Sequence, residues 1–242
     1  GEIVTFDKTG NLKSEFMPVD VKKAHCIFEY IYFARLDSKI DNISVYEPES
    51  AAVQLRKDHP VDADLVCGVP DSGLASAKGY SEESGIPFGL AFHKNSYVGR
   101  TFIKPTQKER ESSVKIKLSV LESVVKGKRI VLVDDSIVRG TTISNLITML
   151  RKAGATEVHV RISSPPFLYP CYFGTDVPSN KQLIASSHST EEIRQQIGDS
   201  LGYMPIEELQ NMVGDLPICR ACFDSHYPME VPKQDISALL ES

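Results

Sequence analysis

Short apolar runs alternate with helix-like stretches through the middle of the chain. Residues 63–69 form an apolar run that ends in a turn, and residues 74–83 follow with the small residues of a helix. Residues 129–133 predict the clearest buried strand; its helix follows over 142–152, with Gly154 as the stop signal. Further strands are predicted over 88–92, 157–162 and 182–185. This alternation predicts βαβ units around a mainly parallel sheet flanked by helices, an α/β fold.

Weaker patterns flank this region on both sides. We divide the chain into a linker and N-terminal segment (1–46), a core (47–188) and a C-terminal helical segment (189–242). We expect the two end segments to pack against the core as a hood or cap.

Composition and charge narrow the class of protein. Of the 242 residues, 41% are hydrophobic and 24% are charged, as in an ordinary soluble globular protein. The net charge of −5 argues against a nucleic-acid-binding protein, and no apolar run approaches the ~20 residues of a membrane span. Residues 1–13 show no targeting pattern, and five cysteines are too few for a secreted disulfide scaffold. We therefore expect a cytoplasmic protein with no membrane partner.

Two adjacent carboxylates, Asp134 and Asp135, follow the strand over 129–133. Ligands of open α/β sheets bind at this carboxyl end of the strands. The Gly- and Thr-containing loop that follows opens a helix, and backbone N–H groups in such a loop suit a phosphate group. The carboxylates suit ribose hydroxyls or Mg²⁺. Alone, an Asp pair would more simply be a solvated strand end, but the whole string over 130–142 favours a binding site.

A basic stretch runs from Lys94 to Lys117. It holds seven Lys or Arg residues and two Glu, in a chain that is acidic as a whole. Alone it would read as a solvated loop. Beside a phosphate site, and with Gly99 as a hinge, it reads better as a lid that closes on a polyanion.

The string over 131–142 resembles the 5-phosphoribosyl 1-pyrophosphate (PRPP) signature of type I phosphoribosyltransferases. Its Asp-Asp-Ser-Ile-Val-Arg-Gly-Thr-Thr form is similar to that of the glutamine PRPP amidotransferases (amidophosphoribosyltransferases). Other segments that resemble this family are 28–38, 68–73, 94–103, 163–166 and 199–203. The resemblance covers the family's C-terminal phosphoribosyltransferase domain, and implies the type I phosphoribosyltransferase fold.

The resemblance implies a reaction and a set of site residues. PRPP and ammonia would give 5-phosphoribosylamine and pyrophosphate, the first step of de novo purine biosynthesis. Asp134 and Asp135 would hold the ribose hydroxyls and, with Ser72, Mg²⁺. The pyrophosphate would contact Asp71, Ser72 and Gly73, and the lid would contribute the catalytic residues Lys94, Tyr97 and Arg100. The 5′-phosphate would bind Ser136, Ile137, Val138, Arg139, Gly140, Thr141 and Thr142.

Four cysteines form a second candidate site: Cys26, Cys171, Cys219 and Cys222. Their spacing alone fits a tetrahedral Zn²⁺ site, a 4Fe–4S cluster or unligated packed thiols. The resemblance to the iron–sulfur branch of the amidotransferases implies the 4Fe–4S cluster, with a structural role. Cys67, inside a predicted strand, reads as a core residue.

The chain also departs from the family pattern. No segment corresponds to the N-terminal glutaminase domain, and residues 1–6 resemble its end or the linker after it. Ser96 stands where the family usually has Arg, and Leu36 where it has Pro. We therefore expect the chain to use free ammonia or a glutaminase domain or subunit as partner. The resemblance further implies a homo-oligomer, either a tetramer or a dimer.

Two other functions fit parts of the pattern. A non-catalytic PRPP-sensing regulator would keep the Asp-Asp string, but it would be expected to carry a DNA-binding module and to lack the lid. A salvage phosphoribosyltransferase would usually be shorter and lack the four cysteines. The near-intact lid string over 94–103 favours the enzyme over the regulator.

Overall fold

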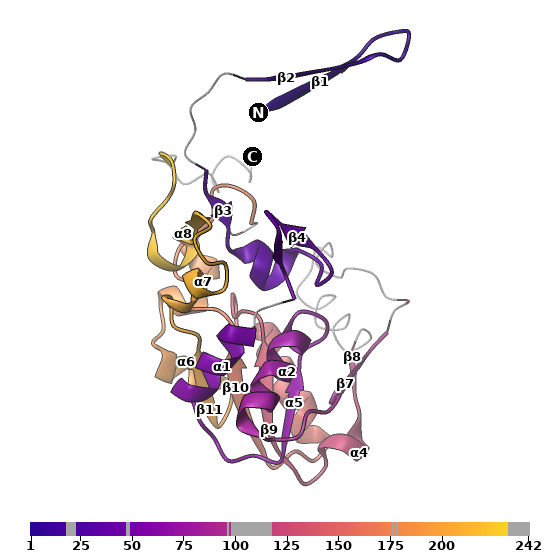
Figure 1. The fold of residues 1–242 in the computed structure, drawn as a ribbon. Coiled ribbons are helices and arrows are strands. Elements are labelled where there is room, and N and C mark those ends of the chain that lie inside the picture. The colour runs from indigo at the N-terminus through magenta and orange to yellow at the C-terminus, as the bar shows by residue number, and fades with distance from the viewer. Residues whose placement is uncertain are drawn as a thin grey trace.

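A four-stranded parallel sheet forms the centre of the molecule. The computed structural model describes residues 1–17, 23–46, 49–95, 97, 118–175, 177 and 179–231, with backbone alone for 49–52. The sheet has the order β11-β10-β9-β6, and every neighbouring pair is parallel. Its strands are β6 (Leu65–Gly68), β9 (Arg129–Asp134), β10 (Glu157–Ile162) and β11 (Ser200–Tyr203). This confirms the predicted α/β fold (Figure 1).

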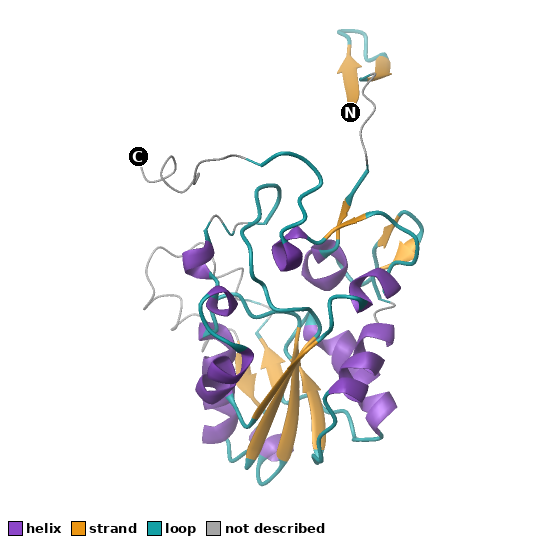
Figure 2. Ribbon diagram, turned by 90° about the vertical axis from the view of Figure 1, so that its left-hand side faces the viewer, coloured by secondary structure: helices purple, strands orange, loops and turns teal. Residues whose placement is uncertain are grey.

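Helices cover both faces of the sheet (Figure 2). On one face lie α1 (Glu49–Asp58) and α2 (Gly73–Ser84), and on the other α5 (Thr141–Lys152) and α6 (Thr190–Ile197). Successive side chains of β9 point to opposite faces: Ile130 and Leu132 join the core that includes α5, while Val131 joins the core that includes α2. Because both faces are buried, β9 is apolar at successive positions rather than alternating with polar residues.

Two predicted strands differ from the structure. Instead of a strand over 88–92, β7 covers Phe92–Lys94 and pairs antiparallel with β8 (Leu118–Val120), which leads into α4 (Glu122–Val125). Phe88 makes an isolated bridge with Val66. The strand predicted over 182–185 is wrong, because this region forms two short 3₁₀ helices, η3 (Asn180–Gln182) and η4 (Ile184–Ser186). The other predicted elements are confirmed, and Gly154 ends the α5 region at a φ of 94°.

Segments from both ends of the chain form a second layer above the carboxyl end of the sheet (Figure 1). Its elements are β3 (His25–Cys26), the π-helical η1 (Glu29–Phe33), β4 (Lys39–Ile40), β5 (Ile43–Ser44), α7 (Glu208–Asn211), β12 (Ile218–Cys219) and α8 (Ala221–Asp224). β3 and β12 pair in parallel. A common core, which includes Phe28, Phe167 and Phe223, holds the layer together. This is the predicted hood, although α6 and β11 from the predicted C-terminal segment lie with the sheet. The domain boundaries at residues 46 and 188 stay predictions.

An N-terminal hairpin consists of β1 (Glu2–Phe6) and β2 (Leu12–Phe16). All ten residues of its strands are exposed. Within the described part of the chain, no helix is both long enough and apolar enough to span a lipid bilayer.

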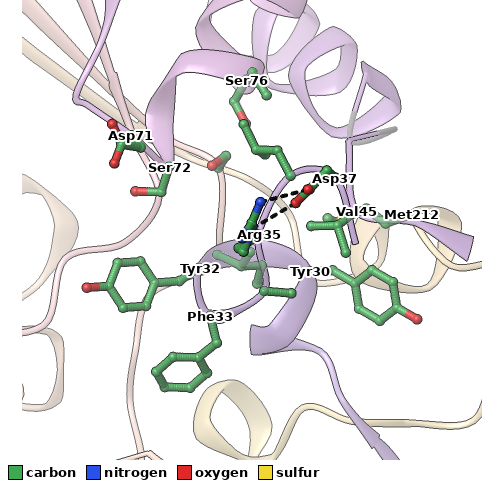
Figure 3. Close-up of a pocket in the computed structure, with 15 residues that line it drawn as sticks. Tyr30, Tyr32, Phe33, Arg35, Asp37, Val45, Asp71, Ser72, Ser76 and Met212 are labelled. Carbon is green, nitrogen blue, oxygen red and sulfur yellow. Dashed lines mark hydrogen bonds and ion pairs between the residues drawn. The ribbon is translucent and has the colours of Figure 1, made fainter. Parts of the chain in front are cut away.

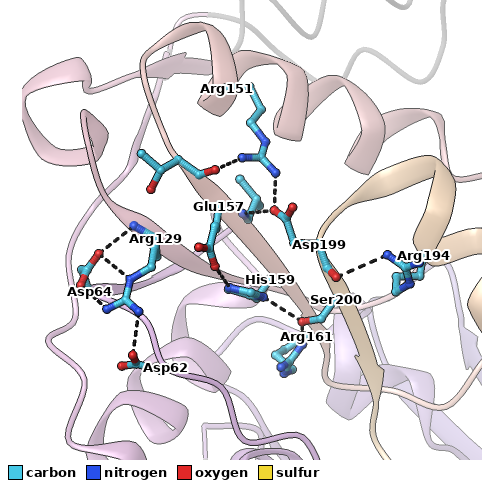
Figure 4. A network of polar contacts seen from close by, with 12 residues as sticks. Asp62, Asp64, Arg129, Arg151, Glu157, His159, Arg161, Arg194, Asp199 and Ser200 are labelled. Carbon is cyan, nitrogen blue, oxygen red and sulfur yellow. Dashed lines mark hydrogen bonds and ion pairs between the residues drawn. The ribbon is translucent and has the colours of Figure 1, made fainter.

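A buried polar network fastens the edge strand β11 to β10 (Figure 4). The Arg161 side chain, only 2% exposed, donates to the His59 carbonyl at 3.0 Å and to Ser200 Oγ at 3.0 Å. Ser200 Oγ also lies 3.0 Å from His159 Nδ1, and His159 Nε2 lies 3.0 Å from the Glu157 carboxylate. The network runs along β10 from Glu157 to Arg161, and Arg161 is opposite Val133, one residue before Asp134 on β9.

Candidate active site

Two loops at the carboxyl ends of β6 and β9 lie side by side. The Val69 N–H donates to the Val133 carbonyl at 2.8 Å. Gly73 makes this approach possible, because a Cβ there would lie 2.5 Å from the Val133 carbonyl oxygen. Gly68 allows the β6–α2 loop to turn tightly, because a Cβ there would lie 2.4 Å from the Gly73 carbonyl oxygen. The motif placed Gly73 in the site, whereas the steric role of Gly68 becomes visible only in the fold. The Pro70–Asp71 peptide bond is cis.

Hydroxyl groups from both loops converge on one carboxylate. Ser72 Oγ donates to Asp135 Oδ2, and Ser136 Oγ donates to Asp135 Oδ1. The Asp135 N–H donates to Asp134 Oδ1 at 3.0 Å. The structure thus brings together the four residues that the sequence assigned to pyrophosphate, ribose, metal and 5′-phosphate contacts.

Burial makes the two carboxylates difficult to ionise together. Asp134 is 7% exposed and Asp135 is 6% exposed. Burial, and then the neighbouring charge of Asp135, raises the pKa of Asp134 well above its usual range. Burial also raises the pKa of Asp135, against the hydrogen bonds from Ser136 and Ser72, which favour its ionised form. Asp135 is therefore the better-stabilised anion, and Asp134 the better site for a proton or for the donors of a ribose.

The loop after the Asp pair leads into the N-terminus of α5. Gly140 adopts a φ of 77°, a left-handed conformation that favours glycine, directly before the helix. The Val138 carbonyl accepts from the Ile184 N–H at 2.9 Å, and Arg139 donates to the Gln182 side chain, so η3 and η4 hold the loop from behind. The first N–H groups of an α-helix have no acceptor within the helix and can bind an anion.

The lid residues are described only in part. Lys94, the last residue of β7, forms an ion pair with Asp71 in the loop after β6. Tyr97 has a fully exposed side chain, at 100%. Arg100 lies outside the described residues, as do Ser96 and Gly99. The structure therefore brings Lys94 to the candidate site, leaves Tyr97 in solvent, and does not test Arg100.

A pocket of about 440 Å³ lies between the Asp71–Ser72 loop and the hood (Figure 3). Arg35 donates to both carboxylate oxygens of Asp37 beside it, at 3.0 and 2.8 Å. Lining residues that were not assigned to the site from sequence include Tyr30, Phe33, Val45, Ser76, Ser163 and Met212. Tyr30, Phe33 and Ser163 lie in segments that resemble the family, but the resemblance gave them no role, and Val45, Ser76 and Met212 lie outside those segments. The folded chain brings these separate segments together at the pocket.

The four candidate ligand cysteines converge in the hood. The β3–β12 register places Cys26 opposite Cys219. The Cys222 carbonyl accepts from the Leu168 N–H at 2.9 Å, which brings the segment before Cys171 alongside. Burial, and then the charges of the other three thiols, raises the pKa of Cys222, so all four lie within electrostatic reach of one another. All are free, and so is Cys67, which is fully buried as expected of a core residue.

The environment of these thiols suits thiolate ligands in part. Burial opposes ionisation of Cys171, but backbone N–H groups of the loop over 173–175 outweigh it and lower its pKa; the Thr175 N–H lies 3.4 Å from Cys171 Sγ. Such donors to sulfur are typical around iron–sulfur clusters. Among the described residues, no three Cys, His, Asp or Glu side chains are arranged to hold a metal ion as they stand. The thiols, with N–H groups beside Cys171, have the donor chemistry that both a cluster and Zn²⁺ use.

Comparisons with known proteins agree with this geometry. The phosphoribosyl transferase domain family matches residues 42–163. The amidophosphoribosyltransferase of Methanocaldococcus jannaschii is 52% identical over 240 residues, which cover 96% of this chain and 51% of that protein. The amidophosphoribosyltransferase of Bacillus subtilis is 49% identical over 239 residues, covering 96% of this chain and 50% of that protein.

A solved structure is similar over the same extent. The glutamine PRPP amidotransferase from B. subtilis, complexed with ADP and GMP, superimposes with a TM-score of 0.82 at 48% identity, covering 97% of this chain and 53% of that chain. The chain thus spans about half the length of these relatives. The match extends through the sheet and the hood, and the sheet is the type I phosphoribosyltransferase fold expected from the sequence. The chain belongs to the phosphoribosyl transferase domain family.

Proposed function

We propose that the chain transfers the phosphoribosyl group of PRPP to ammonia, giving 5-phosphoribosylamine and pyrophosphate in de novo purine biosynthesis. The observation that carries this proposal is the contact of Ser72 and Ser136 with Asp135. It joins the loop assigned to pyrophosphate with the loop assigned to the ribose and 5′-phosphate. A substrate with phosphate groups at both ends of a ribose would fit this arrangement.

The reaction needs no protein nucleophile. When the anomeric C–O bond breaks, the leaving pyrophosphate gains negative charge and the ribose ring gains positive charge. The N–H groups and hydroxyls over 136–142 would hold the 5′-phosphate, and the Asp134 and Asp135 carboxylates would hold the ribose hydroxyls near the developing positive charge. The Lys94 ammonium would stabilise the pyrophosphate, with Tyr97 and Arg100 as further lid contacts.

A magnesium ion fits the oxygen donors of the site. Asp134, Asp135 and Ser72 supply carboxylate and hydroxyl oxygens, which Mg²⁺ prefers. The hydrogen bonds that Ser72 and Ser136 donate to Asp135 hold its carboxylate in place. Bound Mg²⁺ would neutralise charge on the departing pyrophosphate. We also propose that Cys26, Cys171, Cys219 and Cys222 hold a structural 4Fe–4S cluster that takes no part in the transfer.

We propose that the ammonia normally comes from a glutaminase domain or subunit, because the similar B. subtilis enzyme is a glutamine PRPP amidotransferase. A homo-oligomer and a cytoplasmic location belong to the same proposal.

A turnover assay tests the function. Pyrophosphate release from PRPP and Mg²⁺ is measured with ammonia, with glutamine, and with neither. We expect release with ammonia and little with glutamine alone. PRPP binding without pyrophosphate release under any condition would contradict the enzyme and favour the PRPP-sensing regulator.

A further inference from the structure

The ion pair between Asp71 and Lys94 joins two elements that border the proposed pyrophosphate position. Asp71 lies in the loop between β6 and α2, and Lys94 ends β7. The Lys94 ammonium donates to Asp71 Oδ2. Among the described residues, no other side chain is recorded in contact with this carboxylate. A cation suited to pyrophosphate is therefore already paired with an anion of the chain itself.

The carboxylate and the pyrophosphate would compete for the same partner. Both present anionic oxygens that accept charge-assisted hydrogen bonds from an ammonium group. An ammonium group that is paired with the carboxylate is less available to a pyrophosphate, so the two anions compete for Lys94. Asp71 also differs from the Asp pair, because its side chain is 67% exposed and is held by no hydroxyl group among the described residues.

We propose that Asp71 is an internal competitor of pyrophosphate, which holds the Lys94 ammonium beside the site and releases it when the pyrophosphate group of the substrate binds. This inference rests on the proposed function and changes the role of one residue within it. Asp71 is then a positioning residue that acts through Lys94, and its carboxylate is not a ligand of the pyrophosphate.

The competition is expected to be weak enough for the substrate to overcome. Ion pairs between exposed side chains contribute little free energy, so replacing the carboxylate by an amide should tighten pyrophosphate binding about two- to fivefold at low salt. Added salt screens exposed charges and should reduce this difference. Asp71→Glu, which keeps the charge, should bind close to the wild-type level.

Calorimetric titration of inorganic pyrophosphate into the full chain, without Mg²⁺ and at low salt, tests the proposal. The proteins compared are the wild type, Asp71→Asn, Lys94→Ala and the double variant. Asp71→Asn should bind more tightly than wild type, and Lys94→Ala less tightly. If the carboxylate acts through Lys94, Asp71→Asn should have no effect once Lys94 is replaced, so the two changes should not be additive.

A matched control is available on α2. Glu82 is a similarly exposed carboxylate that pairs with Lys78, four residues away on the helix. Glu82→Gln removes the same charge from the chain and should leave pyrophosphate affinity unchanged. If Glu82→Gln and Asp71→Asn raised the pyrophosphate affinity equally, the effect would come from the net charge of the chain, and the proposal would be overturned.

Two further outcomes would also overturn it. One is Asp71→Asn binding that is equal to or weaker than wild type, and the other is a gain that persists in the Lys94→Ala background. With ammonia-dependent turnover of PRPP intact, either result rejects the internal competitor alone. A wild-type chain that neither binds pyrophosphate with Mg²⁺ nor turns over PRPP would reject the proposed function itself.

Discussion

The Asp134–Asp135 pair places two acidic groups where little water reaches them. Burying these acidic groups destabilises the free chain. It also strengthens their interactions with a bound substrate, because electrostatic interactions are stronger away from water. We expect Asp134→Asn or Asp135→Asn to lower PRPP turnover at least ~100-fold, since each removes an acidic oxygen that would hold a ribose hydroxyl or Mg²⁺ beside the reacting carbon. Pyrophosphate release measures the effect, with Asp62→Asn, at the far end of the sheet, as the control. Near-normal turnover in both Asp134→Asn and Asp135→Asn would reject the assignment.

The burial of Asp134 also predicts that Asp134→Asn, which should lower turnover, raises the stability of the free chain. Because the pKa of Asp134 is raised in the folded chain, the native state binds more protons than the unfolded state between the unfolded pKa and the raised one. The free energy of unfolding therefore falls as pH rises through this window. Without PRPP and Mg²⁺, Asp134→Asn should raise the Tm at pH 7 to 8, and the gain should vanish below the ordinary pKa of about 3.9. Thermal unfolding followed across this pH range measures the change, and a lower Tm for the variant at neutral pH would contradict it.

For single residues, the sequence predicts which residues belong to the site better than it predicts which residues they contact. Asp134, Asp135 and Ser72 were all assigned from their strings, and the structure brings them together. The pairing of Asp71 with Lys94 was not predicted, since it depends on where β7 ends relative to the loop after β6. The close approach of Gly73 to the Val133 carbonyl was hidden for the same reason: a sequence gives no distance between two loops.

The two adjacent loops of the site depend on close backbone packing. A methyl group on Gly73 would lie 2.5 Å from the Val133 carbonyl oxygen, which is backbone and cannot move aside like a side chain. We expect Gly73→Ala to lower the free energy of unfolding by at least about 1–3 kcal/mol, as overpacking does. It should also weaken PRPP binding, because Ser72 would shift away from Asp135. Urea unfolding and PRPP titration measure the two effects.

Gly174→Ala is the control for this change, because no atom of the described residues, apart from those of its chain neighbours, lies within 4 Å of the added methyl group. Equal stability in the two variants would show that the β6 and β9 loops can separate without cost.

Strands buried on both faces of the sheet were predicted well, whereas the short apolar run over 182–185 was not. The apolar run over 129–133 gave β9 almost to the residue. Residues 182–185 carry a similar apolar run, but η3 and η4 form there because the Ile184 N–H donates to the Val138 carbonyl behind the phosphate loop, and not to a strand. A strand pattern shows burial, but it does not show which neighbour accepts the backbone hydrogen bonds.

The hood is held together by segments from both ends of the chain, and the proposed cluster lies where they meet. Protein purified without oxygen should be brown and carry about four iron and four sulfide per chain. Cys171→Ser should abolish the colour, whereas Cys67→Ser should keep it, because Cys67 lies in β6 away from the hood. Zinc in place of iron, with iron available, would favour the tetrahedral Zn²⁺ site.

Loss of the cluster should loosen the hood before the sheet. Limited proteolysis of Cys171→Ser should cut first near β3 and α8, while the parallel sheet stays intact. Early cleavage within the sheet, or a colourless, metal-free and fully active wild type, would show that these cysteines are packed thiols without a ligand role.

The pairing of β3 with β12 also constrains how the chain is made. A ribosome that adds ~5–20 residues per second needs roughly 10–40 seconds to go from Cys26 to Cys219, about 190 residues later. During that interval the nascent β3 has no β12 to pair with, although the sheet strands β6, β9 and β10 have already been synthesised. The sheet can therefore form first, and the hood, with any cluster it holds, is completed only when translation reaches the last two cysteines.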